Sequence, residues 1–292
     1  MSRPDTGSDF QPRAAQRGRT AKIFRWIFFG ATTLAIVVLA VLLLDVLRTG
    51  ATHVSWRFIV SYPSRFPESA GILVGLLGSL WTLGLTALLS FPLGIATAIW
   101  LEEYAPSGWL SRTIQMNIAN LASVPSVVYG ILGLALFVQW MNLGRSILAG
   151  SLTLTLLILP VIIISSQEAI RSVPKSIRLA AFALGATRWQ TVSRQVFPAA
   201  IPGILTGTIL ALSRAVGETA PLILIGAAAY VPFAPVSPMD EFTVLPIQIF
   251  NWISRPQPQF HQIAAAGIIV LLIVLLSFNL AAILLRNHYS KR

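Results

Sequence analysis

The chain has 292 residues, of which 55% are hydrophobic and only 11% are charged, and its mean hydropathy is +0.75. About a quarter of the residues of a soluble globular domain are charged, so this composition excludes such a fold and indicates a membrane protein. The net charge of +11 does not indicate nucleic-acid binding, because the Lys and Arg residues lie in tails and loops between apolar runs. The absence of cysteine excludes disulfides and thiolate metal sites.

The amino-terminal residues 1–25 are rich in Arg, Gly, Ser and Pro and show no apolar periodicity. This composition predicts a disordered, basic cytoplasmic tail that is attracted to anionic lipid. The apolar run at 26–47 is longer than the core of a cleaved signal peptide, about 7–15 residues, and no small-residue cleavage site follows it. We therefore expect residues 26–47 to form a retained first transmembrane anchor.

Several apolar runs reach the length of about 20 residues that a helix needs to cross a bilayer. They predict an all-α fold, a polytopic membrane helical bundle with six transmembrane helices. The predicted spans are residues 26–47, 72–100, 118–140, 147–166, 201–230 and 263–285.

Positive charge is distributed unevenly between the two sides of this predicted bundle. Of the 21 Lys and Arg residues, fifteen lie on the side of the amino terminus, five lie on the other side, and Arg214 lies within a span. Cytoplasmic loops carry the excess of Lys and Arg in membrane proteins. The sequence therefore predicts that both termini are cytoplasmic, including a short carboxy-terminal tail at 286–292.

Four prolines fall inside the predicted spans: Pro92, Pro125, Pro160 and Pro221. Each removes a backbone hydrogen bond and clashes with the carbonyl four residues earlier, so each is a candidate helix break. Proline is also common in ordinary membrane helices, and we favour that interpretation for Pro92 and Pro160. Pro125 and Pro221 are the predicted breaks.

The predicted third span contains small and hydroxyl residues around Pro125. Ser123, Ser126 and Gly130 are spaced to share one helical face. Hydroxyl groups that face a cavity could contact an oxyanion. Small residues of this kind more often mediate close helix packing, which is the favoured interpretation.

A polar segment at 167–200 separates the fourth and fifth predicted spans and carries five basic residues. Pro174 suits the first turn of a helix, and residues 177–184 form a short helical pattern that ends at Gly185, a candidate C-cap. A second short helix is predicted at 188–196. The segment therefore has structure of its own.

The first of these short helices is narrow and carries apolar anchors. Ala180 and Ala181 keep its face small, and Phe182 and Leu184 are apolar, so it suits a groove on another protein. A surface helix at the lipid headgroups, anchored by Trp189 and the arginines, would have the same features. Spacing alone leaves both interpretations open.

The predicted fifth span contains Arg214 and Glu218, and charges inside a membrane are costly enough to indicate function. The two residues are four apart and share a helical face, which Gly207, Ala211 and Pro221 extend. The sequence therefore predicts a helical face of mostly small residues with the charged pair Arg214 and Glu218 near one end.

The run GETAP (217–221) is expected to break this helix, because Pro221 cannot donate to the carbonyl of Gly217. Free backbone groups are tolerated only where protein or water covers them, which suggests a pathway lining that includes Thr219. Arg214 offers a fork of donors that suits phosphate oxygens, and Glu218 would orient it or bond a protonated oxygen. A buried ion pair that holds helices together is the alternative.

The predicted outer loop at 231–262 contains six prolines and an apolar, aromatic patch at 244–252. A long loop without helical signals is often functional, so it could receive a soluble binding protein or cap the outer mouth. A lipid-interface segment anchored by Trp252 is an equally good interpretation.

The chain lacks the residues of an enzyme active site. None of its lysines follows a glycine, so the P-loop that cradles ATP phosphates is absent. His53, His261 and His288 lie outside the spans and far apart, which argues against a metal or catalytic cluster. We expect no cofactor on this chain and expect ATP and Mg on a partner subunit.

The segment at 167–200 resembles the signature loop of ABC import permeases, which reads EAA, three residues, Gly, nine residues and an I-x-L-P ending. The positions that fall on this pattern are Leu179, Ala180, Ala181, Gly185, Gln195, Phe197 and Pro198. Leu179 replaces the usual Glu, Gln195 the usual Ile and Phe197 the usual Leu. The resemblance implies a coupling helix that docks on the nucleotide-binding subunit through Ile177, Leu179, Ala180, Ala181, Phe182, Leu184, Gly185 and Trp189.

Four stretches together are similar to phosphate ABC transporter permeases of the PstA type: SVPSVVYG, the coupling loop, SRAVGETAPLI and IFNWISRPQPQFHQIAAAGIIVLL. This resemblance covers residues 71–285, the expected permease domain. RAVGETAP is its most specific part, because related permeases for other substrates share the coupling loop without it. The candidate pathway residues are Arg214, Glu218, Gly217, Thr219, Ser123 and Ser126.

The resemblance implies a permease subunit of an ATP-driven inorganic phosphate importer in the bacterial plasma (inner) membrane. Its implied partners are a second homologous permease subunit, two ATP-binding subunits and an extracytoplasmic phosphate-binding protein. Charge alone would also permit sulfate or another oxyanion. An ion-coupled carrier and a membrane-embedded enzyme are the competing classes, but the charged break occurs once, and no set of nucleophile, base and metal ligands is present.

Overall fold

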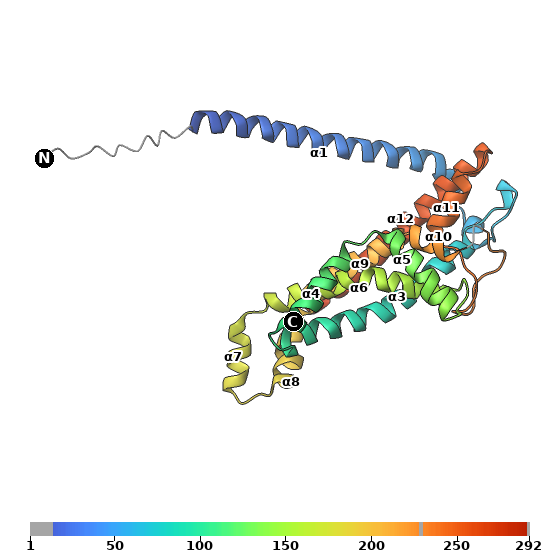
Figure 1. The fold of residues 1–292 in the computed structure, drawn as a ribbon. Coiled ribbons are helices and arrows are strands. Elements are labelled where there is room, and N and C mark those ends of the chain that lie inside the picture. The colour runs from blue at the N-terminus through green and yellow to red at the C-terminus, as the bar shows by residue number, and fades with distance from the viewer. Residues whose placement is uncertain (1–13, 228–229, 291–292) are drawn as a thin grey trace. The chain divides into compact units, whose positions relative to one another are not determined.

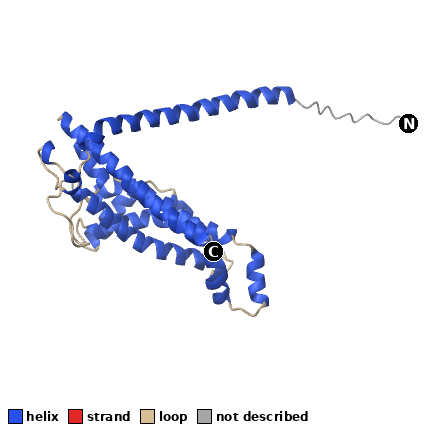
Figure 2. Ribbon diagram, turned by 180° about the vertical axis from the view of Figure 1, so that it is seen from behind, coloured by secondary structure: helices blue, strands red, loops and turns tan. Residues whose placement is uncertain are grey.

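The computed structural model describes residues 14–227 and 230–290. Within these ranges the chain is helical, and its one β interaction is an isolated bridge between Ser146 and Glu241. Figure 2 shows helices joined by loops throughout the described part of the chain. The predicted all-α membrane bundle is confirmed.

The first helix, α1 (Ala14–Gly50), belongs to a unit of its own at residues 1–48. The stretch Lys22–His53 is long and apolar enough to cross a membrane, in agreement with the predicted anchor. The tail prediction is wrong in part, because the helix begins at Ala14 and therefore includes residues 14–25. Alanine and arginine favour helix here, and no proline separates the basic segment from the apolar helix, although Gly18 lies within it. Residues 1–13 of the predicted tail lie outside the described residues.

The second unit, residues 49–292, contains the rest of the helices. They are α2 (Trp56–Val60), α3 (Leu73–Ile99), α4 (Trp109–Ala122), α5 (Ser126–Gly133), α6 (Ile147–Ser172), α7 (Lys175–Ala183), α8 (Arg188–Thr191), α9 (Phe197–Gly217), α10 (Ala220–Ile225), α11 (Leu245–Ile253) and α12 (Pro258–Ser290). In Figure 1, α7 and α8 lie at one end of this bundle and α11 lies at the opposite end. We name these the α7 end and the α11 end.

Five helices of the described chain are long and apolar enough to cross a membrane, and a bent pair makes six if it counts as one span. The predicted tail at 286–292 is not separate from the last of them, because α12 continues to Ser290. Residues 291–292 lie outside the described residues.

The bent pair corrects the predicted third span at 118–140. Helices α4 and α5 meet at an angle of 102° across a break that ends at Pro125. The hydroxyl of Tyr129 in α5 donates to the carbonyl of Leu121 in α4 at 2.8 Å, and this carbonyl also accepts from the Val124 N–H at 3.1 Å. Because Ser123 and Ser126 lie on either side of this break, the predicted single helical face does not exist.

Helix α6 is the centre of the bundle and packs against both α3 and α9. A Cβ atom added at Gly207 of α9 would lie 2.2 Å from the Ser165 hydroxyl of α6, so the two helices approach closely there. Ala211 is also buried. Gly207, Ala211 and Arg214 lie in the same helix as predicted, and α6 covers the part of the face at Gly207.

The two prolines assigned to ordinary helices follow that interpretation. Pro92 lies inside α3 and Pro160 inside α6, and neither ends its helix. Pro160 is buried between neighbouring helices, whereas Pro92 lies on an exposed face of α3. The breaks lie at residues 123–125, ending at Pro125, and at residues 218–219, before Pro221.

The predicted outer loop at 231–262 contains a buried helix. Helix α11 packs against α3 and α12, and Trp252 is only 2% exposed. The interpretation of Trp252 as a lipid anchor is therefore wrong. The prolines of this segment argued against a helix. Pro246 nevertheless lies in the first turn of α11, where proline is tolerated.

Polar contacts fasten α11 to the first turns of α3. The backbone N–H of Leu245 donates to the Ser79 hydroxyl at 2.8 Å. The Gln248 side chain accepts from the Gly75 N–H at 3.1 Å and donates to the Gly71 carbonyl at 2.9 Å. Buried polar groups that are satisfied in this way fix one arrangement of the two helices.

We expect Gly78→Val to destabilise this end of the bundle strongly. A Cβ atom at Gly78 would lie 2.0 Å from the carbonyl oxygen of Thr243. This oxygen belongs to the main chain, so no change of side-chain rotamer can relieve the clash. The expected cost is about 3 kcal/mol, the upper end for an overpacked core, which lowers the Tm by roughly 6–12 °C. Thermal unfolding in detergent measures it.

Gly84→Val is the matched control, because Gly84 lies in the same helix and has no atom within 4 Å of an added Cβ. Both variants carry the same cost of valine in a helix. Equal melting temperatures for the two variants would contradict the close approach at Gly78.

Candidate functional site

The predicted break in the fifth span is present in the structure. Helix α9 ends at Gly217, Glu218 adopts an extended conformation, and Pro221 lies in the first turn of α10. Helix α10 ends after six residues at Gly226, whose φ of +96° is left-handed and favours glycine. The break therefore results from proline at the start of α10, as the sequence indicated.

Arg214 and Glu218 form an ion pair at this break, with 3.3 Å between Nε of the arginine and Oε1 of the glutamate. The Arg214 side chain is 52% exposed and the Glu218 side chain 18% exposed. The neighbouring Gly217 is also exposed, and no atom lies within 4 Å of where its Cβ would be. The guanidinium therefore has open space around it.

A half-exposed guanidinium inside a spanning segment needs water or another protein beside it, because hydrocarbon would be costly. The pair joins two adjacent turns of one segment and does not link two helices. Among the described residues Arg214 makes no ion pair with another helix. The geometry therefore gives no support to a buried pair that holds the bundle together, and it leaves donors of Arg214 available to an anion.

The structure brings the two broken segments against each other. Helices α5 and α10 pack together, and a Cβ atom at Gly130 would lie 2.7 Å from Cα of Pro221. This contact agrees with close helix packing for Gly130. Ser123 is exposed but its hydroxyl donates to the Asn120 carbonyl at 2.7 Å, and Ser126 is half-buried at the start of α5.

The predicted coupling helix is present as α7, and Gly185 follows it with a φ of +80°. A capping box between Thr187 and Gln190 starts α8. The predicted second helix at 188–196 is not separate, because α8 continues into α9 as one helix, Arg188–Gly217. Pro198 lies in the first turn of α9, where it does not interrupt the chain.

Large apolar side chains of this segment are exposed. Leu179, Phe182 and Trp189 are exposed, and Leu184 is 88% exposed. Contiguous exposed apolar side chains of this kind mark an interface. Ile177 differs, because it packs against the apolar cluster at the α7 end and fastens α7 to the bundle.

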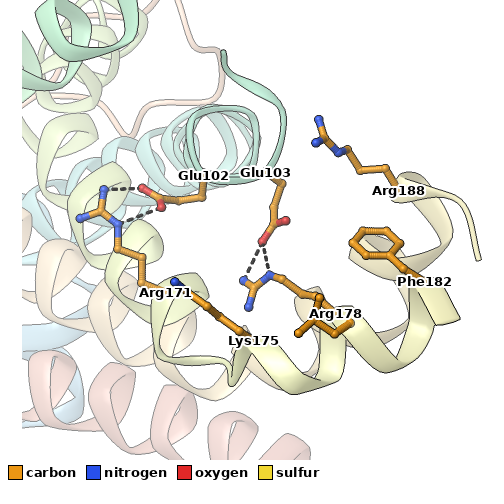
Figure 3. Close-up of a pocket in the computed structure, with 8 residues that line it drawn as sticks. Glu102, Glu103, Arg171, Lys175, Arg178, Phe182 and Arg188 are labelled. Carbon is orange, nitrogen blue, oxygen red and sulfur yellow. Dashed lines mark hydrogen bonds and ion pairs between the residues drawn. The ribbon is translucent and has the colours of Figure 1, made fainter. Parts of the chain in front are cut away.

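Sequence inspection missed two carboxylates at the α7 end. Glu102 and Glu103 line an open cavity of about 650 Å³, together with Arg171, Lys175, Arg178, Leu179, Phe182 and Arg188 (Figure 3). Both acids end the apolar run of α3, where charge is ordinary. Their partners are more than 60 residues away in the chain, so no local spacing could have revealed them.

Residues 90–292 match the family described as "Binding-protein-dependent transport system inner membrane component". The chain is 35% identical over 275 residues to the probable ABC transporter permease protein YqgI of Bacillus subtilis, with 90% of this chain and 94% of that protein covered. It is 32% identical over 293 residues to the phosphate transport system permease protein PstA 1 of Mycobacterium tuberculosis, with 97% and 94% covered.

Solved structures share the fold. A bacterial alginate ABC transporter in complex with an alginate pentasaccharide-bound periplasmic protein matches 91% of this chain and 94% of its own, with a TM-score of 0.66 and 16% identity. An inward-facing MetNI methionine ABC transporter matches 75% of this chain and 97% of its own, with a TM-score of 0.61 and 18% identity.

Family membership implies an ABC ATPase and a substrate-binding protein as partners, and a location in the inner membrane. The spanning helices, the charged break and the exposed apolar side chains of α7 are consistent with that role. The chain belongs to the family of binding-protein-dependent transport system inner membrane components and is a transmembrane permease subunit of an ABC importer.

Proposed function

We propose that this permease carries inorganic phosphate and that the ion passes beside Arg214 and Glu218. The observation that carries the proposal is the half-exposed guanidinium at a helix break, with open space at Gly217. Arginine binds phosphate oxygens through two parallel hydrogen bonds. The relatives named phosphate transport system permease proteins support phosphate over other oxyanions.

Glu218 has a separate role in this proposal. It accepts from Arg214 in the absence of substrate, which keeps the guanidinium oriented along the broken segment. A hydrogen phosphate ion would replace the contact between Arg214 and Glu218. Its hydroxyl group would donate a hydrogen bond to the carboxylate of Glu218. The backbone at Gly217 and Thr219 is accessible to the ion in this proposal. Ser123 and Ser126, at the break between α4 and α5, are further candidates for contact with the ion.

The α7 end is cytoplasmic in this proposal, and so are both termini. The support is the excess of Lys and Arg on that side of the bundle. Helix α7 then presents Leu179, Phe182 and Leu184 to an ATP-binding subunit, with Trp189 beside them. The narrow face at Ala180 and Ala181 allows a close fit in a groove.

The chain binds neither ATP nor a cofactor in this proposal, and ATP with Mg binds to the partner subunits. The complex consists of this chain, a second homologous permease subunit, two ATP-binding subunits and an extracytoplasmic phosphate-binding protein. Closure of the ATP-binding subunits would move α7 and reorient the spans, so that the Arg214 region opens to each side in turn.

Uptake by proteoliposomes that contain the whole complex tests this function. Labelled phosphate should accumulate when ATP and the binding protein are supplied, and it should continue to accumulate after ion gradients are collapsed. Uptake without ATP that stops when an ion gradient is removed would instead show a secondary carrier. Uptake of sulfate at the same rate would refute the assignment of phosphate as the specific substrate.

A further inference from the structure

An ion pair joins the coupling helix to the end of a spanning helix. Glu103 lies in the stretch Trp100–Tyr104 that extends α3, and Arg178 lies in α7. The distances from Glu103 Oε1 to Nη2 and Nε of Arg178 are 2.7 and 3.0 Å. Their side chains are only 19% (Arg178) and 12% (Glu103) exposed, and Figure 3 shows them pointing toward each other.

Arg178 also bonds to the end of α6. Its Nη1 donates to the carbonyl of Val173 at 2.8 Å, and its Nη2 donates to the carbonyl of Ile170 at 3.0 Å. Carbonyls at the end of a helix lack the usual helical donor, and the Ile170 carbonyl also accepts from the Val173 N–H at 3.3 Å. One guanidinium therefore ties α7 to both α3 and α6.

Besides Arg178, α7 is attached through the two residues that join it to α6 and through contacts with α8 and Val192–Val196. No side chain of α7 is fully buried, and Ile177 is its partly buried apolar contact with the bundle. Arg178 is the polar contact through which a force on the exposed face of α7 would reach the end of α3 directly. Helix α3 in turn packs against α6, α9 and α11, and α9 carries Arg214.

The adjacent acid offers a natural comparison. Glu102 accepts from Nη2 and Nε of Arg171 at 2.6 and 2.8 Å, and from the Gln167 side chain at 2.8 Å. Arg171 and Gln167 both lie in α6, so this pair joins α3 to α6 without touching α7. The Arg171 side chain is 56% exposed, so water weakens the pair.

We propose that the Glu103–Arg178 pair makes α7 and the α7 end of α3 move as one body, and that it sets how much phosphate is transported per ATP hydrolysed. This inference rests on the proposed function, because it requires an ATP-binding subunit at α7. Glu103 and Arg178 are positioning residues in this account. They touch neither phosphate nor ATP, and they act on the pathway through α3.

The test uses the complete complex in proteoliposomes and measures ATP hydrolysis and phosphate uptake together. For Glu103→Gln we expect normal assembly and ATP hydrolysis close to that of the wild type, with phosphate transported per ATP lower by about fivefold, within the range of known coupling mutations. Glu102→Gln, the matched control, is expected to keep the wild-type ratio. A pair that only stabilises the fold would lower assembly and leave the ratio unchanged.

A second variant keeps the test decisive if Glu103→Gln does not fold. The chain contains no cysteine, so Glu103→Cys with Arg178→Cys can be joined by a short bifunctional maleimide. The amount of phosphate transported per ATP hydrolysed should be low before the two cysteines are cross-linked and should recover after cross-linking.

A wild-type ratio in Glu103→Gln, an equal loss in Glu102→Gln, or no recovery on joining would overturn the inference. Failure of phosphate to stimulate the wild-type complex would instead refute the proposed function.

Discussion

Gly185→Trp is expected to lower ATP-driven uptake strongly while the membrane-spanning bundle remains folded. Gly185 has a φ of +80°, so any side chain with a Cβ atom is strained there, at a cost of about 1–2 kcal/mol. No atom lies within 4 Å of the added Cβ, which shows that the turn is open. The indole would therefore project next to the exposed Leu184, where the ATP-binding subunit is expected to dock.

Uptake by the reconstituted complex should fall by about tenfold or more, since both the turn geometry and the docking surface change. ATP hydrolysis should lose its dependence on transport. Gly185→Asn is the control, because asparagine tolerates the left-handed conformation better than other residues with a side chain. Normal uptake by Gly185→Trp would count against α7 as the coupling helix.

Arg214→Lys is expected to lower phosphate uptake even though the positive charge is kept. Lysine is a point charge that lacks the planar fork of donors, so it cannot hold two phosphate oxygens at once. The loss of one charged hydrogen bond, about 1.5–3 kcal/mol, corresponds to roughly 10- to 100-fold in uptake at low phosphate. Initial rates measured against phosphate concentration test this prediction.

Arg286→Lys is the matched control for Arg214→Lys. Arg286 lies near α9, with its Nη1 at 3.5 Å from the Thr206 hydroxyl, and it is distant in sequence from the break at Glu218. Uptake should stay close to that of the wild type in this variant. An unchanged affinity and rate in Arg214→Lys would refute bidentate binding by Arg214.

Local signals in the sequence were sufficient for most of the spanning helices and for two helix ends. Apolar runs predicted the spans, Pro221 predicted the break before α10, and Gly185 predicted the end of α7. Each of these features depends on residues within one or two turns. The charged break could be located for the same reason.

Features that depend on distant residues could not be predicted in this way. Pro125 indicated a break, but the 102° bend also depends on Tyr129 reaching back to Leu121. The burial of α11 depends on a contact between Leu245 and Ser79, 166 residues apart. Helical periodicity shows which residues share a face, and it does not show where a neighbouring helix covers that face.

The most direct test of the central claim is the rate of ATP hydrolysis by the complete complex in the presence of its binding protein. Phosphate should raise this rate above its basal value, and sulfate at the same concentration should leave it unchanged. The stimulation should be lost in Gly185→Trp and weakened in Arg214→Lys. Equal stimulation by sulfate, or no stimulation by phosphate, would contradict a phosphate importer whose pathway contains Arg214.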